Sequence, residues 1–413
     1  MNIGLVTTWF ERGAAYVSRQ YRQVLESNHQ VFIYARGGEA YGQGDPNWDD
    51  SQVTWGKRLP FVTKSAIDRR DLRQWILRHQ IEMVIFNEQD WWPPVFWCND
   101  WGVKTGAYVD YYTEDTIPFF AGYDFLLCNT QRHYSIFNWH PHSFYVPWGT
   151  DTRLFWPRCV EPLESDHVVF FHSAGMSPRR KGTDLIIEAF DRLDDKARLV
   201  IHAQQSLERQ LPHLTDKIKR LVAAAKLICR TETVSPPGLY HLGDVYVYPS
   251  RLEGIGLTIA EALACGLPVI TTDHPPMNEF VQPPINGRLV EVEQLIARAD
   301  GYYWPQAIVR VDDLAQAMQF YIDRRGELAQ FKKAARQYAE EHLTWARNAA
   351  FLPERLEQIT KQPTVIWQAA EQQALAYEQG RMSLQQKYPY FFYGAHLLWR
   401  PMKFLRKTLG IRP

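Results

Sequence analysis

The segment that decides the fold spans residues 249–270 and reads PSRLEGIGLTIAEALACGLPVI. It begins where a short apolar run ends, continues through a loop with two glycines, and enters a helical pattern near Leu257. The amides of Gly256, Leu257 and Thr258 would then point out of the helix N-terminus, which favours a phosphate group. The segment therefore predicts a strand–loop–helix unit that binds phosphate.

Two glutamates flank this helix start. Glu261 follows Leu257 by four residues, so both lie on one helix face, where a carboxylate can accept the hydroxyls of a ribose. Glu253 lies in the loop, within reach of a donor sugar, and Gly254 and Gly256 allow a close backbone approach to a ligand. Two surface glutamates beside a helix cap would have the same spacing, and only the complete strand–loop–helix context favours a binding site.

Short apolar runs alternate with helical patterns on both sides of this segment. That alternation predicts an α/β fold with two Rossmann-like, doubly wound parallel sheets whose strand ends would face each other across a cleft. The first series has predicted strands at 3–7, 31–35, 83–86, 106–109 and 125–128 and helices at 69–78 and 131–138. The second has strands at 168–172, 199–202, 227–230, 245–248 and 269–271 and helices at 183–193, 207–224 and 258–265.

The two series are separated by residues 147–166, where Pro147, Pro157 and Pro162 break both periods. After residue 310 the pattern is helical, at 314–321, 328–342 and 344–360. We therefore predict an N-terminal domain over 1–155, a C-terminal domain over 156–345, and C-terminal helices with a basic aromatic tail over 346–413 that pack back on the N-terminal domain.

Composition narrows the class of protein. The chain has 413 residues, 46% of them hydrophobic, and 46 basic residues balance 46 acidic ones, so no global field favours nucleic acid. The N-terminus does not resemble a signal peptide, and no apolar stretch approaches the length of a membrane span, so we expect a cytoplasmic protein. The scattered cysteines predict reduced thiols and no zinc site: Cys98, Cys128, Cys159, Cys229 and Cys265.

Four segments, in order and spacing, resemble glycosyltransferase family 4, a family of retaining GT-B glycosyltransferases. Glu253 and Glu261 form an E-x7-E motif, and residues 147–155, PWGTDTRLF, are similar to the family's G-x-D-x-x-x-F linker. Residues 180–190, RKGTDLIIEAF, are similar to its K-G-x-x-x-L-I-x-A-F segment, and Glu279 lies in a stretch like its E-x-V motif. The resemblance is strong over residues 145–290, weak over the first domain and absent from the last fifty residues.

The resemblance implies a mechanism. Lys181, with Arg180 nearby, would neutralise the leaving diphosphate, on which charge grows in the transition state. Glu261 would hold the ribose and Glu253 the donor sugar, and the anomeric configuration would be retained. The donor would be a nucleotide-diphosphate sugar, UDP- or GDP-linked, and the acceptor a carbohydrate or lipid-linked glycan. Without the resemblance, residues 179–181 would be a solvated basic loop.

Other donor-binding patterns do not occur in the sequence. It contains no D-x-D, the motif by which the alternative sugar-transfer fold holds a divalent metal, and neither a P-loop nor a complete G-x-G-x-x-G. We therefore expect no metal and no cofactor.

Three positions depart from the family pattern. Gly175 takes the place of an arginine six residues before Lys181, so either Arg179 or Arg180 substitutes from a different direction or the phosphate site is weaker. Gly13 is a lone glycine where the family has a pair, and it either supplies an amide to the donor phosphate or forms an ordinary turn. Asp110 stands in the place of a histidine, as a contact for the reacting sugar or as a helix cap.

The first domain should bind the acceptor. Residues 90–97, DWWPPVFW, follow a predicted strand, and their two prolines argue against a regular helix; most of these rings should be buried. His133, His140 and His142 do not have the spacing of a helical zinc pair. The tail over 387–413 has six basic residues and no acidic one, which suits either an anionic membrane surface or packing on the first domain.

Two other functions fit the same fold. One is epimerisation of a sugar nucleotide, which needs no acceptor. The other is a donor-binding subunit without catalysis, suggested by Gly175 and Gly13. The intact Lys181, Glu253 and Glu261 argue against the second, because a decayed site should lose these residues first.

Overall fold

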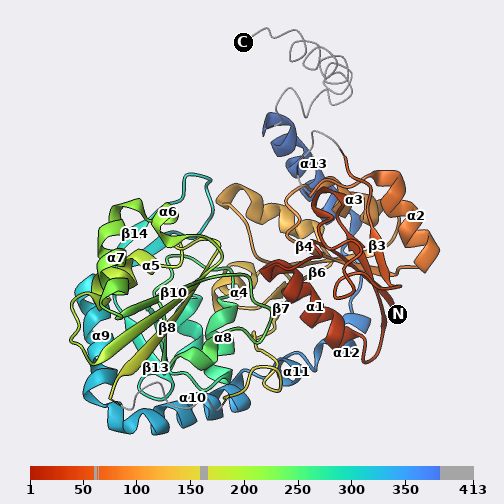
Figure 1. Cartoon of the computed structure of the whole chain (residues 1–413). Coiled ribbons are helices and arrows are strands. Elements are labelled where there is room, and N and C mark those ends of the chain that lie inside the picture. The colour runs from red at the N-terminus through yellow and green to blue at the C-terminus, as the bar shows by residue number, and fades with distance from the viewer. Residues whose placement is uncertain (60–62, 64, 159–165, 382–413) are drawn as a thin grey trace, which may run out of the picture. The chain divides into compact units, whose positions relative to one another are not determined.

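The computed structural model describes residues 1–59, 63, 65–158 and 166–381 (Figure 1). The chain divides into two compact units. The first contains residues 1–127, 137–144 and the chain from Phe351, and the second contains residues 128–136 and 145–350. The sequence places the domain boundary after residue 155, whereas the continuous part of the second unit begins at Tyr145. The basic aromatic tail over 387–413 lies outside the described residues.

A seven-stranded sheet forms the centre of the first unit, in the order β3-β2-β1-β4-β5-β6-β7. The pairings from β3 to β6 are parallel. The chain moves outward from β1 through β2 to β3 and then restarts at β4 on the other side of β1, so the switch point of this doubly wound sheet lies between β1 and β4. The strands are β1 Asn2–Thr7, β2 Gln30–Ala35, β3 Val53–Trp55, β4 Met83–Asn87, β5 Lys104–Tyr108, β6 Phe125–Cys128 and β7 Ser143–Tyr145.

Helices connect these strands, and the C-terminal helices return to the same unit. The Tyr377 ring of α13 lies 5.4 Å from that of Phe119, and the Trp92 amide donates to Glu378 Oε1 at 3.1 Å. The helices are α1 Gly13–Leu25, η1 Gly37–Glu39, α2 Arg69–His79, α3 Pro93–Asp100, η2 Glu114–Gly122, α4 Gln131–Phe137, α12 Leu352–Glu357 and α13 Thr364–Arg381, of which α4 belongs mostly to the second unit.

The expectation of no regular helix across residues 90–97 is wrong. Helix α3 begins at Pro93, and both prolines occupy its first turn. A proline there forfeits no intrahelical hydrogen bond, because the amides of the first turn have no helical acceptor. Trp92 is buried, whereas Trp91 and Trp97 are half-buried.

A second parallel sheet, of six strands, forms the centre of the second unit in the order β10-β9-β8-β11-β12-β13. The strands β8, β9, β11 and β12 are largely buried, as expected for a parallel sheet between helices, whereas the edge strand β10 is exposed after Leu227. The strands are β8 Val168–Gly175, β9 Ala197–Ala203, β10 Leu227–Thr231, β11 Val245–Tyr248, β12 Val269–Thr272 and β13 Gly287–Val290. A separate antiparallel pair, β14 Val292–Ile296 and β15 Gln306–Val309, was not expected from the sequence.

The helices of the second unit differ from the prediction in two places. The predicted helix over 207–224 is interrupted at Pro212, which has no amide to continue it, and the stretch 344–360 is divided into α11 and α12. The helices are α5 Thr183–Phe190, α6 Leu207–Gln210, η3 Pro212–Leu214, α7 Thr215–Ala223, η4 Tyr240–Leu242, α8 Leu257–Ala264, η5 Met277–Phe280, α9 Val311–Asp323, η6 Arg325–Glu327, α10 Leu328–His342 and α11 Trp345–Asn348.

Within the part of the chain that is described, no helix combines the length and the apolar character required to cross a bilayer.

Candidate active site

Two glycines let the loops of the second unit meet at the carboxyl end of its sheet. Gly256 has φ 92° and immediately precedes α8, and Gly182 has φ 74° and immediately precedes α5. A Cβ on Gly182 would lie 2.2 Å from the carbonyl oxygen of Pro249, just after β11. Only glycine fits there, and the close approach brings residues 180 and 181 against the loop that carries Glu253.

One carboxylate oxygen of Glu253 contacts side chains from both loops. Oε1 accepts hydrogen bonds from Lys181 Nζ at 2.7 Å, from the Tyr248 hydroxyl at 2.9 Å and from Ser250 Oγ at 2.5 Å. Arg180 Nη1 lies 3.0 Å from the same oxygen. Lys181 Nζ also contacts the Tyr248 hydroxyl. Glu253 is buried, so two cations face one carboxylate in a largely dehydrated place, and one positive charge is left over.

The pKa values follow from this arrangement. Burial raises the pKa of Glu253, but Lys181 and Arg180 outweigh it and hold the pKa at about 2. Burial lowers the pKa of Lys181 to about 8 despite the opposing charge of Glu253. The Glu253 charge raises the pKa of Arg180. At neutral pH the carboxylate is ionised and both cations are charged, which suits a phosphate ligand.

The loop before α5 is itself fixed by the loop after β11. Arg251 binds both carboxylate oxygens of Asp184, at 2.8 and 2.7 Å, and also contacts the carbonyl of Arg179. The Arg251 amide donates to the carbonyl of Arg180 at 2.8 Å. These bonds hold the backbone of residues 179–180 in place, so the cations are positioned before any ligand arrives.

Arg180, and not Gly175, brings a guanidinium group to Glu253. Gly175, at the end of β8, has φ 55° and carries no side chain to offer. The Arg180 guanidinium instead reaches Glu253 and donates to the carbonyl of Leu252 at 2.6 Å. Arg179 is exposed and contributes its carbonyl. Of the two substitutes considered from the sequence, the structure brings Arg180 to Glu253.

Glu261 lies on α8, one turn after Leu257, and is half-buried. Its Oε2 accepts a hydrogen bond of 2.5 Å from the Tyr240 hydroxyl. Burial raises its pKa, opposed by the Tyr240 hydrogen bond and the charge of Lys181. The first-turn amides of Leu257 and Thr258 have no acceptor within the helix, and no acidic residue occupies that turn. Helix dipole, free amides and the cations of Lys181 and Arg180 all favour an anion here.

Residues of α4 meet the same loop within the second unit. Arg132 contacts the carbonyl of Glu253 and donates to that of Pro275 at 3.1 Å, and His133 Nε2 lies 3.2 Å from the Gly254 carbonyl oxygen. Glu279 accepts the amides of Gln131 and Arg132 at 2.6 and 2.9 Å, which makes it the anion at the start of α4.

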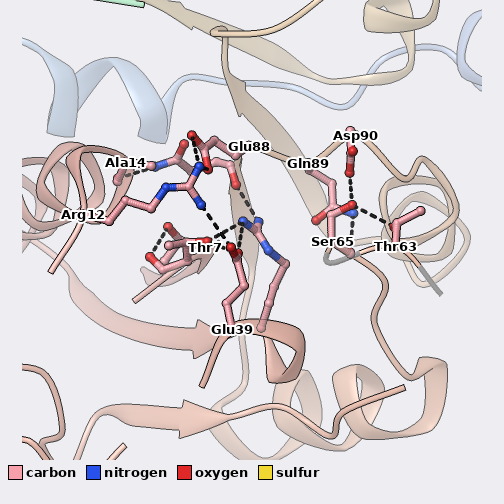
Figure 2. A network of polar contacts seen from close by, with 12 residues as sticks. Thr7, Arg12, Ala14, Glu39, Thr63, Ser65, Glu88, Gln89 and Asp90 are labelled. Atoms are coloured by element: carbon pink, nitrogen blue, oxygen red, sulfur yellow. Dashed lines mark hydrogen bonds and ion pairs between the residues drawn. The ribbon is translucent and has the colours of Figure 1, made fainter. Parts of the chain in front are cut away.

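The carboxyl end of the first unit's sheet carries a different network (Figure 2). Arg12 forms ion pairs of 3.0 Å with Glu39 and with Glu88, which follow β2 and β4. Arg36 is almost completely buried, donates to the Asn87 carbonyl at 2.6 Å and lies 3.8 Å from Glu39. Both guanidinium groups are therefore already bound to groups of the protein.

Asp110 belongs to the same charged group, after β5. Burial, followed by the charge of Glu88, raises its pKa to about 8, so its carboxyl is protonated at neutral pH. The helix that follows it, η2, is capped by Thr113 with Thr116, and not by Asp110. The helix-cap alternative is thus wrong for this helix.

Gly13 is the first residue of α1, and the preceding Arg12 has extended backbone and makes no side-chain cap. No acidic residue occupies the first turn. The free amides of this turn are consistent with either alternative drawn from the sequence, a phosphate contact or an ordinary turn.

His133 and His140 each place a ring nitrogen against a backbone carbonyl oxygen. His140 Nε2 lies 3.0 Å from the Tyr123 carbonyl oxygen, and burial lowers the pKa of His140 to about 4. In the described ranges no cluster of three or more His, Cys, Asp or Glu side chains has the geometry to hold a metal ion. Cys98, Cys128, Cys229 and Cys265 form no disulfide within those ranges, and Cys159 lies outside them.

Sequence reasoning missed several residues of the site. Tyr248 and Ser250 bind Glu253, Tyr240 binds Glu261, and Arg132 contacts the Glu253 loop. The pattern at the end of β11 offered a usable indication for Tyr248 and Ser250, since polar side chains at a strand end next to a glycine loop face the ligand side. Tyr240 and Arg132 come from distant segments, and no pattern in the sequence indicated that they contribute to the site.

Comparison with known proteins relates part of the second unit to glycosyltransferases. Residues 166–302 match a family model described as "Glycosyl transferases group 1". The chain is 29% identical over 176 residues to D-inositol 3-phosphate glycosyltransferase of Xylanimonas cellulosilytica, covering 38% of this chain and 40% of that protein. It is 32% identical over 149 residues to lipopolysaccharide core biosynthesis mannosyltransferase LpsB of Rhizobium meliloti, covering 32% and 41%. The matches thus span about two fifths of these relatives.

Likeness in structure extends over both units. The Anabaena protein HepE, solved in complex with UDP and glucose, superposes with a TM-score of 0.65 at 15% identity, covering 87% of this chain and 100% of that one. The chain has the fold of the GT-B glycosyltransferases: two parallel-sheet, Rossmann-like α/β units with additional helices.

Proposed function

We propose that this protein is a retaining, metal-independent glycosyltransferase that moves a sugar from a nucleotide-diphosphate sugar to a glycan or a lipid-linked glycan. The observation that carries the proposal is the pair Lys181 and Arg180, held against buried Glu253 beside the N-terminus of α8. The match of residues 166–302 to a glycosyltransferase family model supports it.

The donor would lie along the carboxyl end of the second unit's sheet. Its diphosphate would contact the amides of Gly256, Leu257 and Thr258 and the cations of Lys181 and Arg180. Glu261 would accept the ribose hydroxyls, with Tyr240 fixing the carboxylate through the 2.5 Å hydrogen bond. UDP is the favoured nucleotide, because the structural neighbour HepE was solved with UDP bound.

Transfer would break the bond between the anomeric carbon and the diphosphate oxygen and form a bond from that carbon to an acceptor hydroxyl oxygen. The acceptor proton would pass to the departing diphosphate on the same face, which retains the configuration. Lys181 and Arg180 would stabilise the charge that grows on the leaving group. Glu253 would orient both cations and the hydroxyls of the donor sugar, and no side-chain nucleophile would be needed.

The first unit would bind the acceptor. Its sheet presents carboxyl groups where ligands of doubly wound sheets bind, and carboxyl groups accept hydrogen bonds from sugar hydroxyls. Asp110, protonated at neutral pH, would also donate a hydrogen bond to the reacting sugar. Gly13 would offer its amide to the donor phosphate. Peripheral contact of residues 387–413 with an anionic membrane surface is part of this proposal for a lipid-linked acceptor.

The proposal is tested by incubating the protein with UDP-sugars and a panel of glycan acceptors in excess EDTA and assigning the product anomer by NMR. We expect transfer in EDTA, with the donor's anomeric configuration kept. An inverted product would refute retention, and activity that returns only with Mg²⁺ or Mn²⁺ would refute metal independence. Conversion of the donor alone into another nucleotide sugar would indicate an epimerase instead.

A further inference from the structure

The second unit contains a cavity of roughly 540 Å³ at the end of the sheet opposite to Lys181 and Glu253. Val169 at the start of β8, Asp244 just before β11 and Leu267 just before β12 line it, so it lies at the amino ends of these strands. Lys181 and Glu253 lie beyond the carboxyl ends of the same sheet. The volume is in the range of small-molecule sites.

Basic side chains dominate the polar lining of this cavity, with Asp244 as the one carboxylate among the described lining residues. Asp244 is neutralised by Lys332 at 2.6 Å. The basic lining residues are Arg158, His167, His241, Lys332, Lys333 and Arg336.

Two of these cations are not committed to a partner in the described structure. Arg336 forms an ion pair with Glu340 at 2.7 Å and donates to backbone carbonyls, including that of Ala264 at 2.6 Å. For Arg158 and Lys333, by contrast, no ion pair is found with any residue that the structure describes. Burial and then the charge of Arg158 lower the pKa of His241, so Arg158 acts electrostatically on another residue that lines the cavity. The cavity thus has surplus positive charge, which attracts anions.

An aromatic wall accompanies the cations. Trp156 lines the cavity and is 51% exposed, so its ring is available to a ligand. Leu267 and Tyr240 are buried and close the apolar side. Sugar rings pack on such aromatic faces, while phosphate groups pair with arginine and lysine.

Tyr240 connects this cavity to the proposed donor site. It lines the cavity, and its hydroxyl donates the 2.5 Å hydrogen bond to Glu261. It is only 5% exposed and packs edge-on against Phe171, with ring centroids 5.7 Å apart. A ligand that packs against Tyr240 would therefore restrict the side chain that orients Glu261, which lowers the entropic cost of ordering it for nucleotide binding.

We propose that this cavity binds a phosphorylated sugar, with Arg158 and Lys333 on the phosphate and Trp156 against the sugar ring, and that its occupation tightens nucleotide binding through Tyr240. The second half rests on the proposed function, because it takes Glu261 as the ribose ligand. The first half does not depend on it.

The first experiment titrates glucose 1-phosphate, with methyl α-glucoside as the uncharged probe, into Lys181→Ala protein by calorimetry, so that donor-site binding is weakened. We expect glucose 1-phosphate to bind and the uncharged sugar not to bind. In the same background, Arg158→Gln with Lys333→Gln should weaken binding tenfold or more. Arg209→Gln with Lys219→Gln removes the same charge from exposed positions elsewhere and should leave binding within a factor of two. Equal binding by the two double variants, or no binding, overturns the proposal.

The second experiment measures UDP affinity with and without saturating glucose 1-phosphate. Competition at the donor site is the same in wild type and in the Arg158→Gln, Lys333→Gln variant, so the difference between them isolates the cavity. We expect UDP to bind about fivefold tighter with the cavity filled, and Tyr240→Phe to abolish that gain while keeping sugar-phosphate binding. An effect of glucose 1-phosphate on UDP affinity that is equal in wild type and in the Arg158→Gln, Lys333→Gln variant overturns the coupling. If UDP binds neither wild type nor any variant, while glucose 1-phosphate still binds wild type, the proposed function fails and the cavity site stands.

Discussion

The carboxyl ends of the two sheets differ in how they balance charge. In the second unit, Lys181 and Arg180 face the single carboxylate of Glu253, which leaves a positive excess beside the free amides of α8. In the first unit, Arg12 and Arg36 are outnumbered by carboxyl groups, namely Glu39, Glu88, Asp90 and Asp110. One sheet end suits a diphosphate and the other suits hydroxyl groups, although both have the same doubly wound topology.

The contrast also shows how each end is kept in place. The cationic site depends on close backbone approach at Gly182 and on the Arg251–Asp184 pair. The acidic network depends on burial, which raises the pKa values of Glu88, Asp90 and Asp110. Substitutions in the cationic site should therefore affect turnover. Substitutions in the acidic network should affect how activity and stability depend on pH.

The largest effect is expected from Lys181→Ala. Removing the cation that faces the leaving diphosphate should lower kcat by about 100- to 1,000-fold, the usual loss for one preorganised donor to transition-state charge. KM for the donor should change much less. Steady-state kinetics with Lys219→Ala, an exposed lysine on α7, as the control would measure this. An unchanged kcat in Lys181→Ala would contradict the assigned role.

A smaller effect, on folding, is expected from Gly182→Ala. The new Cβ would lie 2.2 Å from the Pro249 carbonyl oxygen at φ 74°, so the site loops must separate. We expect a loss of about 2–4 kcal/mol in the free energy of unfolding. The control is Gly326→Ala, where a Cβ meets nothing within 4 Å. Equal urea midpoints for the two variants would show that the close approach does not support the site.

The smallest effect is a pH dependence. The pKa of Lys181 is lowered to about 8 and that of Asp110 is raised to about 8, so above this pH the lysine loses its charge and the aspartate gains one. Both changes oppose binding, and kcat/KM should fall on the alkaline side. Asp110→Asn should remove one of the two ionisations. At pH 9, one unit above the pKa, kcat/KM of this variant, each relative to its own value at neutral pH, should therefore be about tenfold higher than that of wild type.

The raised pKa of Asp110 also makes the folding stability depend on pH. The folded-state pKa of Asp110 lies above the ordinary value of 3.8, so its favourable contribution is complete below that value and is lost as the pH rises to about 8. The melting temperature of wild type should therefore fall relative to that of Asp110→Asn between pH 5 and pH 8. Parallel curves for the two proteins would argue that Asp110 is not protonated in the fold.

The sequence was most informative where function is local in the chain. Glu253, Glu261 and the amides between them lie in one segment, so its complete strand–loop–helix pattern predicts their common place. Lys181 could be added because its segment has a similar strand-to-helix context. Both sheets and most strand positions followed from periodicity, because buried parallel strands are short continuous apolar runs.

What could not be predicted depends on contacts between distant segments. Tyr240 reaches Glu261 from a short 3-10 turn, and Arg132 reaches the Glu253 loop from 121 residues away. The acidic network combines residues that follow β1, β2, β4 and β5, and its members are unremarkable one at a time. The helix at Pro93 was missed because the prolines were weighed without their position in the first turn.

We propose that the second unit holds a nucleotide-diphosphate site built on Lys181 and Glu261, and titration calorimetry with UDP in EDTA measures binding at this site. Wild type should bind UDP, Glu261→Ala should weaken that binding at least tenfold through loss of the ribose contact, and Glu357→Ala, an exposed glutamate on α12, should not change it. Equal UDP affinity in wild type and Glu261→Ala would contradict the account.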